Sequence, residues 1–186
     1  MSGKSLIEEL NRSFQHSIRN GKSKKSRQWL VDRKLDLHLA NIGFCSGQVH
    51  HRKPQEYKDS LVEIGFLKPS PKGTNNGNNG YSTFAFQSMV FPLHNEQGNI
   101  VNYYAVCLDG KKKEYLNDNG IYPRYPSIKT IRLFITQNVL DAATLLSADV
   151  LEHREAVISL KEGILTREIQ QMISSLTHLE EVIIIH

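Results

Sequence analysis

Residues 131–185, IRLFITQNVLDAATLLSADVLEHREAVISLKEGILTREIQQMISSLTHLEEVIII, decide the fold class of this chain. Short runs rich in Ile, Val and Leu alternate here with segments of helical periodicity. The order β-α-β-α-β needs right-handed crossovers, so the strands must be parallel. The continuous apolar run at the end is typical of a central strand that is buried on both faces. We predict an α/β sheet with strands at 131–136, 156–160 and 182–185 and helices at 139–147 and 166–176.

The functional groups of such a sheet usually lie in the loops at the carboxyl ends of the strands. Gln137 and Asn138 follow the first predicted strand, and the sequence given ends at His186, directly after the last one. We therefore expect a sheet that is incomplete at the C-terminus, either because the chain is a fragment or because the sheet itself is short.

The segment before this stretch has strand rather than helix periodicity. Residues 82–93 and 100–108 flank the turn sequence NEQGN, which predicts a β-hairpin. The basic turn 111–113 and a loop containing Pro123 and Pro126 complete a β-rich basic subdomain, residues 83–130. The preceding residues, 67–82, are rich in Gly and Asn and predict a loop.

Residues 1–66 are predicted to be mainly helical. In the first helix, 4–20, apolar residues recur every four positions and form one stripe: Leu6, Leu10, Phe14 and Ile18. Further helices are expected at 25–34, 36–42 and 54–65. The predicted organisation is thus an α+β N-terminal subdomain, made of segments 1–66, 67–82 and 83–130, followed by an α/β domain at 131–186.

Composition excludes several classes of protein. The 186 residues are 39% hydrophobic, which is enough for a folded core. No apolar run approaches the ~20 residues of a membrane span, and the first residues lack the apolar centre of a signal peptide, so we expect a cytoplasmic protein without membrane partners. Cys45 and Cys107 form no CxxC pattern, which argues against a disulfide framework or a thiolate zinc site.

Charge is distributed unevenly along the chain. Residues 1–34 carry nine Lys or Arg and three Asp or Glu, a net charge of +6, and residues 111–135 carry a net charge of +4. Residues 136–186 have the opposite sign, with a net charge of −5. Two basic stretches joined to an acidic end suit a protein that handles a polyanion, although solvated helix faces give the same pattern.

Five phrases occur in an order that resembles the catalytic core of bacterial DnaG-type DNA primases: FPLHNEQGNIVNYYAV, EYLNDNG, RLFITQNVLDAATLL, SLKEGILT and LEEVIII. The resemblance covers roughly residues 28–186, and it is strongest to the primase-like toprim proteins of mobile and conjugative elements. It implies a basic subdomain joined to a toprim-like parallel sheet, RNA primer synthesis with Mg²⁺ or Mn²⁺, and three partners: single-stranded DNA, nucleotides and a replicative helicase.

The resemblance also implies where the catalytic positions lie. The family has a Glu after its first toprim strand, where this chain has Gln137, and a Gly next to it, where this chain has Asn138. Asp141 matches an Asp of the following helix, whereas the family's Asp-x-Asp would lie beyond His186. An amide brings no negative charge. We take Gln137 and Asp141 as degenerate catalytic positions, assign no metal ligands, and expect no tight Mg²⁺ or Mn²⁺ binding by this chain.

The phosphate contacts of the family are altered as well. Phe84, Phe86 and Ser88 occupy the region of the family's arginines, and Glu114 replaces a lysine. Flexible ammonium groups nearby could reach a phosphate instead. The candidate nucleic-acid-binding residues are therefore Lys111, Lys112, Lys113, Asn117, Arg124 and Lys129.

Two further groups of residues have alternative interpretations. His38, Cys45, His50 and His51 could suggest a metal cluster, but their spacing matches no common zinc pattern and favours loop and helix-flanking positions. Tyr122 and Tyr125, in a basic loop, could stack on the bases of a single strand or pack inside the protein.

The leading hypothesis is the nucleic-acid-binding part of an RNA-primer-synthesising protein from replication or mobile-element machinery. The alternative is a non-catalytic toprim-like module that binds DNA or a replication partner. A toprim nuclease or topoisomerase-like role is disfavoured because no region with a nucleophilic tyrosine is present. An Asp-x-Asp after His186 would favour the first hypothesis over the second.

Overall fold

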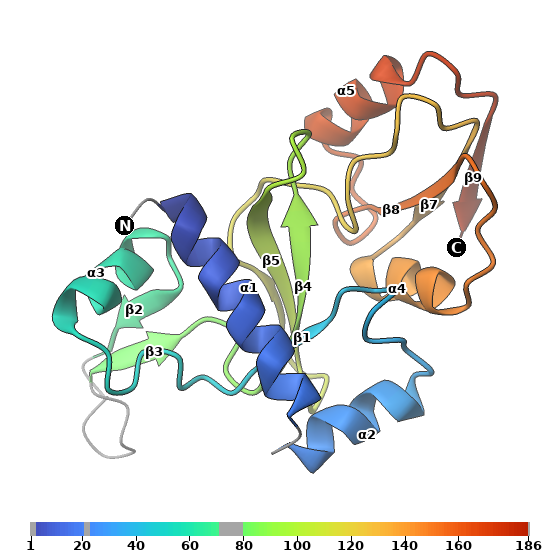
Figure 1. Cartoon of the computed structure of the whole chain (residues 1–186). Helices are drawn as coiled ribbons and strands as arrows, with labels where there is room; N and C mark the ends of the chain where they lie inside the picture. Colours follow the sequence, from blue (N-terminus) through green and yellow to red (C-terminus); the bar gives the residue numbers. More distant parts are fainter. Residues whose placement is uncertain (1–2, 21–22, 71–79, 186) are drawn as a thin grey trace.

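The C-terminal part of the chain, from β7 onward, forms a three-stranded parallel sheet with a helix on each face (Figure 1). The computed structural model describes residues 3–20, 23–70 and 80–185. The sheet consists of β7 (Arg132–Thr136), β8 (Glu155–Ser159) and β9 (Glu181–Ile185) in the order β8-β7-β9. Leu133 and Ile135 pack with α5 (Arg167–Ser175), and Phe134 packs on the other face with α4 (Val139–Ser147). The predicted α/β class and parallel strands are confirmed.

The position of β9 corrects one prediction. We expected this strand to be central and buried on both faces, but β7 is central and β9 lies at the edge. Val182 and Ile184 leave 43% and 58% of their surface exposed. The reason is that α5 packs across β7 and β8, so the described residues leave the side chains of β9 on that face uncovered. An apolar run predicts a strand, but it does not determine the strand order.

The N-terminal half is built on a four-stranded antiparallel sheet covered by a long helix. Its strands are β1 (Gly43–Cys45), β4 (Ser88–His94), β5 (Ile100–Cys107) and β6 (Lys113–Tyr115), in the order β1-β4-β5-β6. The predicted hairpin is β4 and β5. Helix α1 (Gly3–Arg19) buries its stripe of four apolar side chains against the sheet. It passes so close to β1 that a side chain on Gly43 would lie 2.6 Å from Cβ of Phe14.

A shared core joins the two halves. Phe91 and Tyr104, on the sheet face opposite α1, belong to the same cluster as Trp29 of α2 (Lys24–Asp32) and Ala142 of α4. Tyr122 is fully buried in this cluster and donates a hydrogen bond to Ala40 O at 2.7 Å. The parallel sheet is therefore held in a fixed position against the N-terminal subdomain.

Short elements outside this frame differ from the sequence prediction. Helix α3 (Gln55–Glu63) is present where expected, but residues 36–42 form hydrogen-bonded turns, because Asp36 Oδ1 accepts from the backbone N–H groups of His38 and Leu39. Strands β2 (Leu67–Pro69) and β3 (Tyr81–Thr83) pair within the segment predicted as a loop, and residues 71–79 of that segment lie outside the described ones. Of the described helices, none is long and apolar enough to cross a bilayer.

Candidate nucleic-acid interface

The carboxyl edge of the parallel sheet carries both residues that the sequence analysis predicted as degenerate catalytic positions, Gln137 and Asp141. Gln137 and Asp141 are exposed at the end of β7 and in the first turn of α4. Asn138 caps this helix, since its Oδ1 accepts from the N–H groups of Leu140 and Asp141 at 2.9 and 3.1 Å. Its Nδ2 also donates to Asp141 Oδ2 at 2.6 Å. Asn138 thus stabilises the helix start, and the Asp141 carboxylate is held against that cap.

A second carboxylate, not identified from the sequence, lies at the same edge. The turn after β8 docks on β7 through a hydrogen bond from Gly163 N–H to Gln137 O at 2.8 Å. This places Glu162, whose φ is +49°, next to Gln137 and facing the N-terminal sheet. Glu162 Oε1 accepts a hydrogen bond from the Tyr104 hydroxyl at 3.3 Å. The tight turn KEGIL after a parallel strand was the sequence signal for this position.

Two tyrosines of the antiparallel sheet lie on the side that Glu162 faces. The rings of Tyr104 and Tyr115 lie 4.8 Å apart, and Lys161 Nζ lies 5.4 Å from the centre of the Tyr115 ring. Burial, reinforced by the charge of Glu162, raises the pKa of both phenols. Burial lowers the pKa of Lys161, and Asp118 and Glu168 oppose that effect. Both phenols are therefore protonated at neutral pH, and of the two it is Tyr104 that donates a hydrogen bond, to Glu162.

The residues at this edge do not by themselves make a divalent-cation site. Mg²⁺ and Mn²⁺ favour several anionic oxygens. Asp141 is hydrogen-bonded to Asn138 and Glu162 to Tyr104. Among residues 3–20, 23–70 and 80–185, no three His, Cys, Asp or Glu side chains lie close enough together to hold a metal. No catalytic step through a metal is derived from this geometry.

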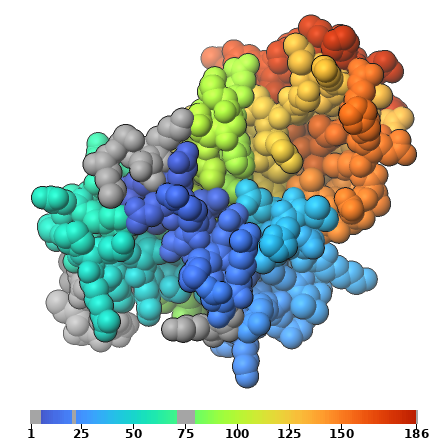
Figure 2. Space-filling model, in the orientation of Figure 1, coloured from blue at the N-terminus to red at the C-terminus, as the bar shows by residue number. Residues whose placement is uncertain are grey.

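A polar groove lies at a different place, at the end of α1 and the start of α2. It has a volume of about 800 Å³. Lys24 and Lys25 lie in the first turn of α2, which Ser23 caps by accepting from Ser26 N–H at 3.2 Å. The groove is lined by His16, Ser17, Asn20, Ser23, Lys24, Lys25, Phe44, Ser46, Gln48, Gln87 and Leu108. Figure 2 shows α1 at the middle of this face and α2 below it, with the α3 region on the left and the C-terminal elements at the upper right.

None of the three predicted lysines 111–113 is among the residues that line this groove, but their turn begins close to one of those residues in the sequence. Leu108 lines it and is followed directly by the turn that contains Lys111, Lys112 and Lys113, all exposed. Lys112 Nζ forms an ion pair with Glu114 Oε1 at 2.7 Å. One basic stretch therefore supplies two lysines to the groove, and the other begins three residues after Leu108, which lines it. The polar side chains of α1 in the groove were missed, because a helix end gives no sequence signal for what packs beside it.

The other predicted contacts lie elsewhere. Asn117 holds its own loop, donating to Val101 O at 2.8 Å and accepting from Asn119 N–H at 2.9 Å. Arg124 and Lys129 line a separate cavity near the start of β8. The structure thus does not bring the six candidate residues together.

Burial decides the tyrosine alternative at Tyr122, whereas Tyr125 is half-buried. Tyr122 is fully buried, which excludes base stacking in this structure, and the Tyr125 hydroxyl donates to Glu168 Oε1 at 2.6 Å. Burial raises the pKa of the Cys45 thiol to about 12. Burial, with the charges of His51 and Lys58, lowers the pKa of His50. Within the described part of the chain, these side chains form no metal cluster.

Comparison with solved structures identifies the fold class, although no protein-family model and no curated protein matches the sequence. The chain has the fold of a DnaG-type primase catalytic core. One similar structure is a DnaG primase catalytic domain bound to single-stranded DNA, with a TM-score of 0.77, 17% identity, and coverage of 98% of this chain and 60% of that one.

Two other structures agree with this assignment. The Aquifex aeolicus primase (zinc-binding and RNA polymerase domains) has a TM-score of 0.77 at 15% identity, with coverage of 98% of this chain and 47% of that one. The E. coli primase catalytic core has a TM-score of 0.70 at 19% identity, covering 97% of this chain and 61% of that one. The chain thus spans about half to three fifths of these structures.

Proposed function

We propose that this chain is the nucleic-acid-binding part of a primase-like protein from replication or mobile-element machinery, acting in the cytoplasm on single-stranded DNA and nucleotides. One observation carries the proposal: Lys24 and Lys25 line the groove, and Leu108, which also lines it, stands three positions before Lys111–Lys113 in the sequence. These charges come from two stretches far apart in the sequence. A row of ammonium groups along an open polar groove is the arrangement that tracks a phosphate backbone.

The fold supports this proposal. A similar solved structure is bound to single-stranded DNA, and the similar RNA polymerase domain of Mycobacterium tuberculosis DnaG is in complex with double-stranded DNA. Primer synthesis, a divalent metal ion and a replicative helicase partner belong to the whole protein that this chain would form part of, and they remain proposals for it.

One observation favours the alternative, a non-catalytic toprim-like module. Position 137 is a neutral amide, and Asp141 is hydrogen-bonded to the helix-capping Asn138. A sheet edge of this kind can bind DNA or a replication partner without catalysing a reaction. The two functions share the groove, so DNA binding tests both, and primer synthesis by the protein with its downstream segment separates them.

Alanine variants test the groove. Binding of a fluorescein-labelled oligothymidylate is followed by anisotropy for Lys24→Ala/Lys25→Ala and for the control pair Lys68→Ala/Arg167→Ala, which removes the same charge from exposed positions elsewhere. We expect the groove pair to weaken binding by roughly tenfold and the control pair by less than about twofold. Equal weakening by both pairs would contradict a DNA path through the groove.

A further inference from the structure

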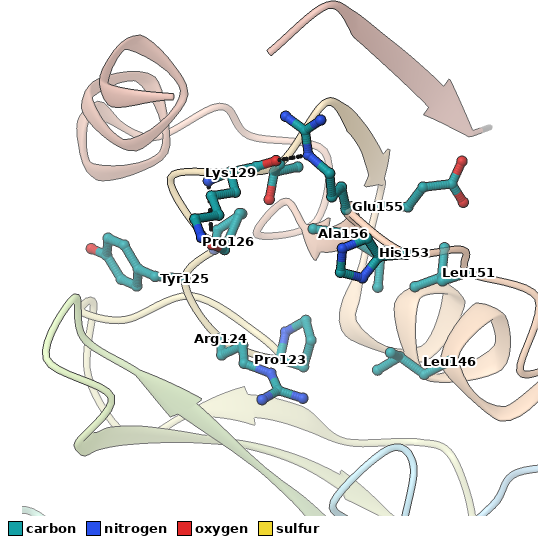
Figure 3. Close-up of a pocket in the computed structure, with 14 residues that line it drawn as sticks. Pro123, Arg124, Tyr125, Pro126, Lys129, Leu146, Leu151, His153, Glu155 and Ala156 are labelled. Carbon is teal, nitrogen blue, oxygen red and sulfur yellow. Dashed lines mark hydrogen bonds between the residues drawn. The ribbon is translucent and has the colours of Figure 1, made fainter. Parts of the chain in front are cut away.

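A cavity at the amino edge of the parallel sheet lies apart from both the groove and the carboxyl edge with Gln137 and Asp141 (Figure 3). Its walls are the loop 123–130, the end of α4 and the first residues of β8. Its volume is about 440 Å³, within the range of small-molecule sites. Apolar side chains cover much of it, namely Pro123, Pro126, Leu146, Leu151, Ala156 and Val157.

Basic side chains stand around this apolar surface. Arg124, Lys129, His153 and Arg154 all line the cavity and are exposed. Arg154 is held in position: its φ is +69°, its Nε donates to Lys129 O at 2.8 Å, and its own carbonyl accepts from Ile131 N–H at 2.9 Å. A non-glycine residue in the left-handed region is kept there only when its surroundings require it. One basic side chain of the cavity is thus already oriented.

The one acidic side chain among the residues that line the cavity is already paired. Glu155 is the acidic residue among those that line it, and Arg132 Nη1 binds its Oε1 at 2.5 Å. Its Oε2 accepts from Glu152 N–H at 2.9 Å, and this bond together with Arg132 lowers the pKa of Glu155. The backbone carbonyl of Leu146, near the C-terminal end of α4, accepts hydrogen bonds from the backbone N–H groups of Ala148 and Asp149. The cavity is therefore left with an excess of positive charge.

We propose that this cavity binds a free nucleoside phosphate, at a site separate from the nucleic-acid groove. The flat base would cover the apolar wall, and the phosphates would meet Arg124, Lys129 and Arg154. Guanidinium and ammonium groups are the usual protein partners of phosphate, and an apolar pocket with a few convergent charged groups suits a small ligand. The site lies at the opposite edge of the sheet from Gln137 and Asp141, so it acts as an accessory site and takes no part in chemistry at that edge.

Calorimetric titration of the whole chain with ATP, in EDTA so that no metal contributes, tests the site. The parent is compared with Arg124→Glu/Lys129→Glu, which reverses two exposed charges of the cavity, and with Lys24→Glu/Lys25→Glu, which reverses two charges of the groove. We expect saturable binding by the parent, at least tenfold weaker binding by the cavity variant, and less than a twofold change in the groove variant. Adenosine and tripolyphosphate should each bind at least tenfold more weakly than ATP.

Absence of saturable ATP binding, or equal weakening in both variants, would overturn the proposal. Hydrogen–deuterium exchange adds a location: ATP should protect residues 123–130 and 151–157. A 5′-phosphorylated oligothymidylate that binds through Arg124 and Lys129, when ATP does not, would instead assign the cavity to a strand end and would also overturn it. DNA binding to the groove is measured separately. A failed ATP titration would therefore leave the proposed function intact, and a failed DNA-binding assay would leave the nucleotide site of the cavity intact.

Discussion

At the scale of single residues, one of the positions at which this chain departs from the pattern of DnaG-type primases is Gln137. Its backbone carbonyl accepts a hydrogen bond from the turn that carries Glu162, so we expect a carboxylate introduced at 137 to lie near that of Glu162. We expect the parent to bind Mn²⁺ weakly and Gln137→Glu to tighten binding by roughly tenfold or less, because charge at the ligands sets affinity for hard cations. Calorimetry measures both.

The control for this change is the double variant Gln137→Glu/Glu162→Gln, which keeps the total charge of the parent. It should return Mn²⁺ binding to the weak value of the parent if the two carboxylates act on one ion. Tight binding by the parent would show that other ligands had been overlooked. Tightening that persists in the double variant would show that Glu162 does not belong to the site.

The three lysines of the β5–β6 turn support a separate prediction at this scale. Lys111, Lys112 and Lys113 are exposed, so changing all three to Ala should leave the melting temperature almost unmoved. The same variant should weaken binding to single-stranded DNA, and the slope of the salt dependence should fall by about 0.7 for each phosphate that the variant no longer binds. Unchanged DNA affinity would remove these lysines from the interface.

At the scale of elements, the N-cap of α4 can be tested directly. Asn138 accepts two backbone hydrogen bonds, and removal of such a cap typically costs about 1 kcal/mol. Urea unfolding should show this decrease in the free energy of unfolding for Asn138→Ala. Thr144→Ala, at an exposed position of the same helix, should change stability by less than about half as much. An equal decrease in the free energy of unfolding for both variants would mean that the Asn138 cap contributes no more than an ordinary exposed side chain of the helix.

The elements also show what the sequence could and could not predict. The α/β half was predicted within one or two residues, because Leu133, Ile135 and the helix Val139–Ser147 follow strict strand and helix periods. Strands β1 and β2 have three residues each, too few for a period to emerge. Residues 36–42 have helical composition, but the Asp36 side chain bonds the backbone in a turn instead. The order of the strands could not be predicted, because it depends on which strands α5 covers in the folded chain.

The candidate site was only partly predictable for a related reason. The sequence could predict Gln137, Asp141 and the lysines 111–113 as candidates, because each lies in or next to one short continuous segment that resembles the family. The groove itself depends on Asn20, Gln48 and Gln87 meeting in space, and no local pattern predicts that.

At the scale of the whole molecule, the shared core makes a prediction about cooperativity. Trp29, the one tryptophan, lies in the cluster that joins α2, the antiparallel sheet and α4. Urea unfolding followed by tryptophan fluorescence and by far-ultraviolet circular dichroism should therefore give coincident transitions. Two separated transitions would show that the halves unfold independently and that the cluster does not couple them.

The central claim, that this primase-core fold binds single-stranded DNA through charges gathered in one groove, is tested most directly by the salt dependence of binding. The measurement is the anisotropy of a labelled oligothymidylate with the parent chain at increasing salt. We predict weak binding that declines linearly in log K against log salt, with a slope of about 0.7 per phosphate bound. Absence of binding at low salt, or binding indifferent to salt, would contradict the account.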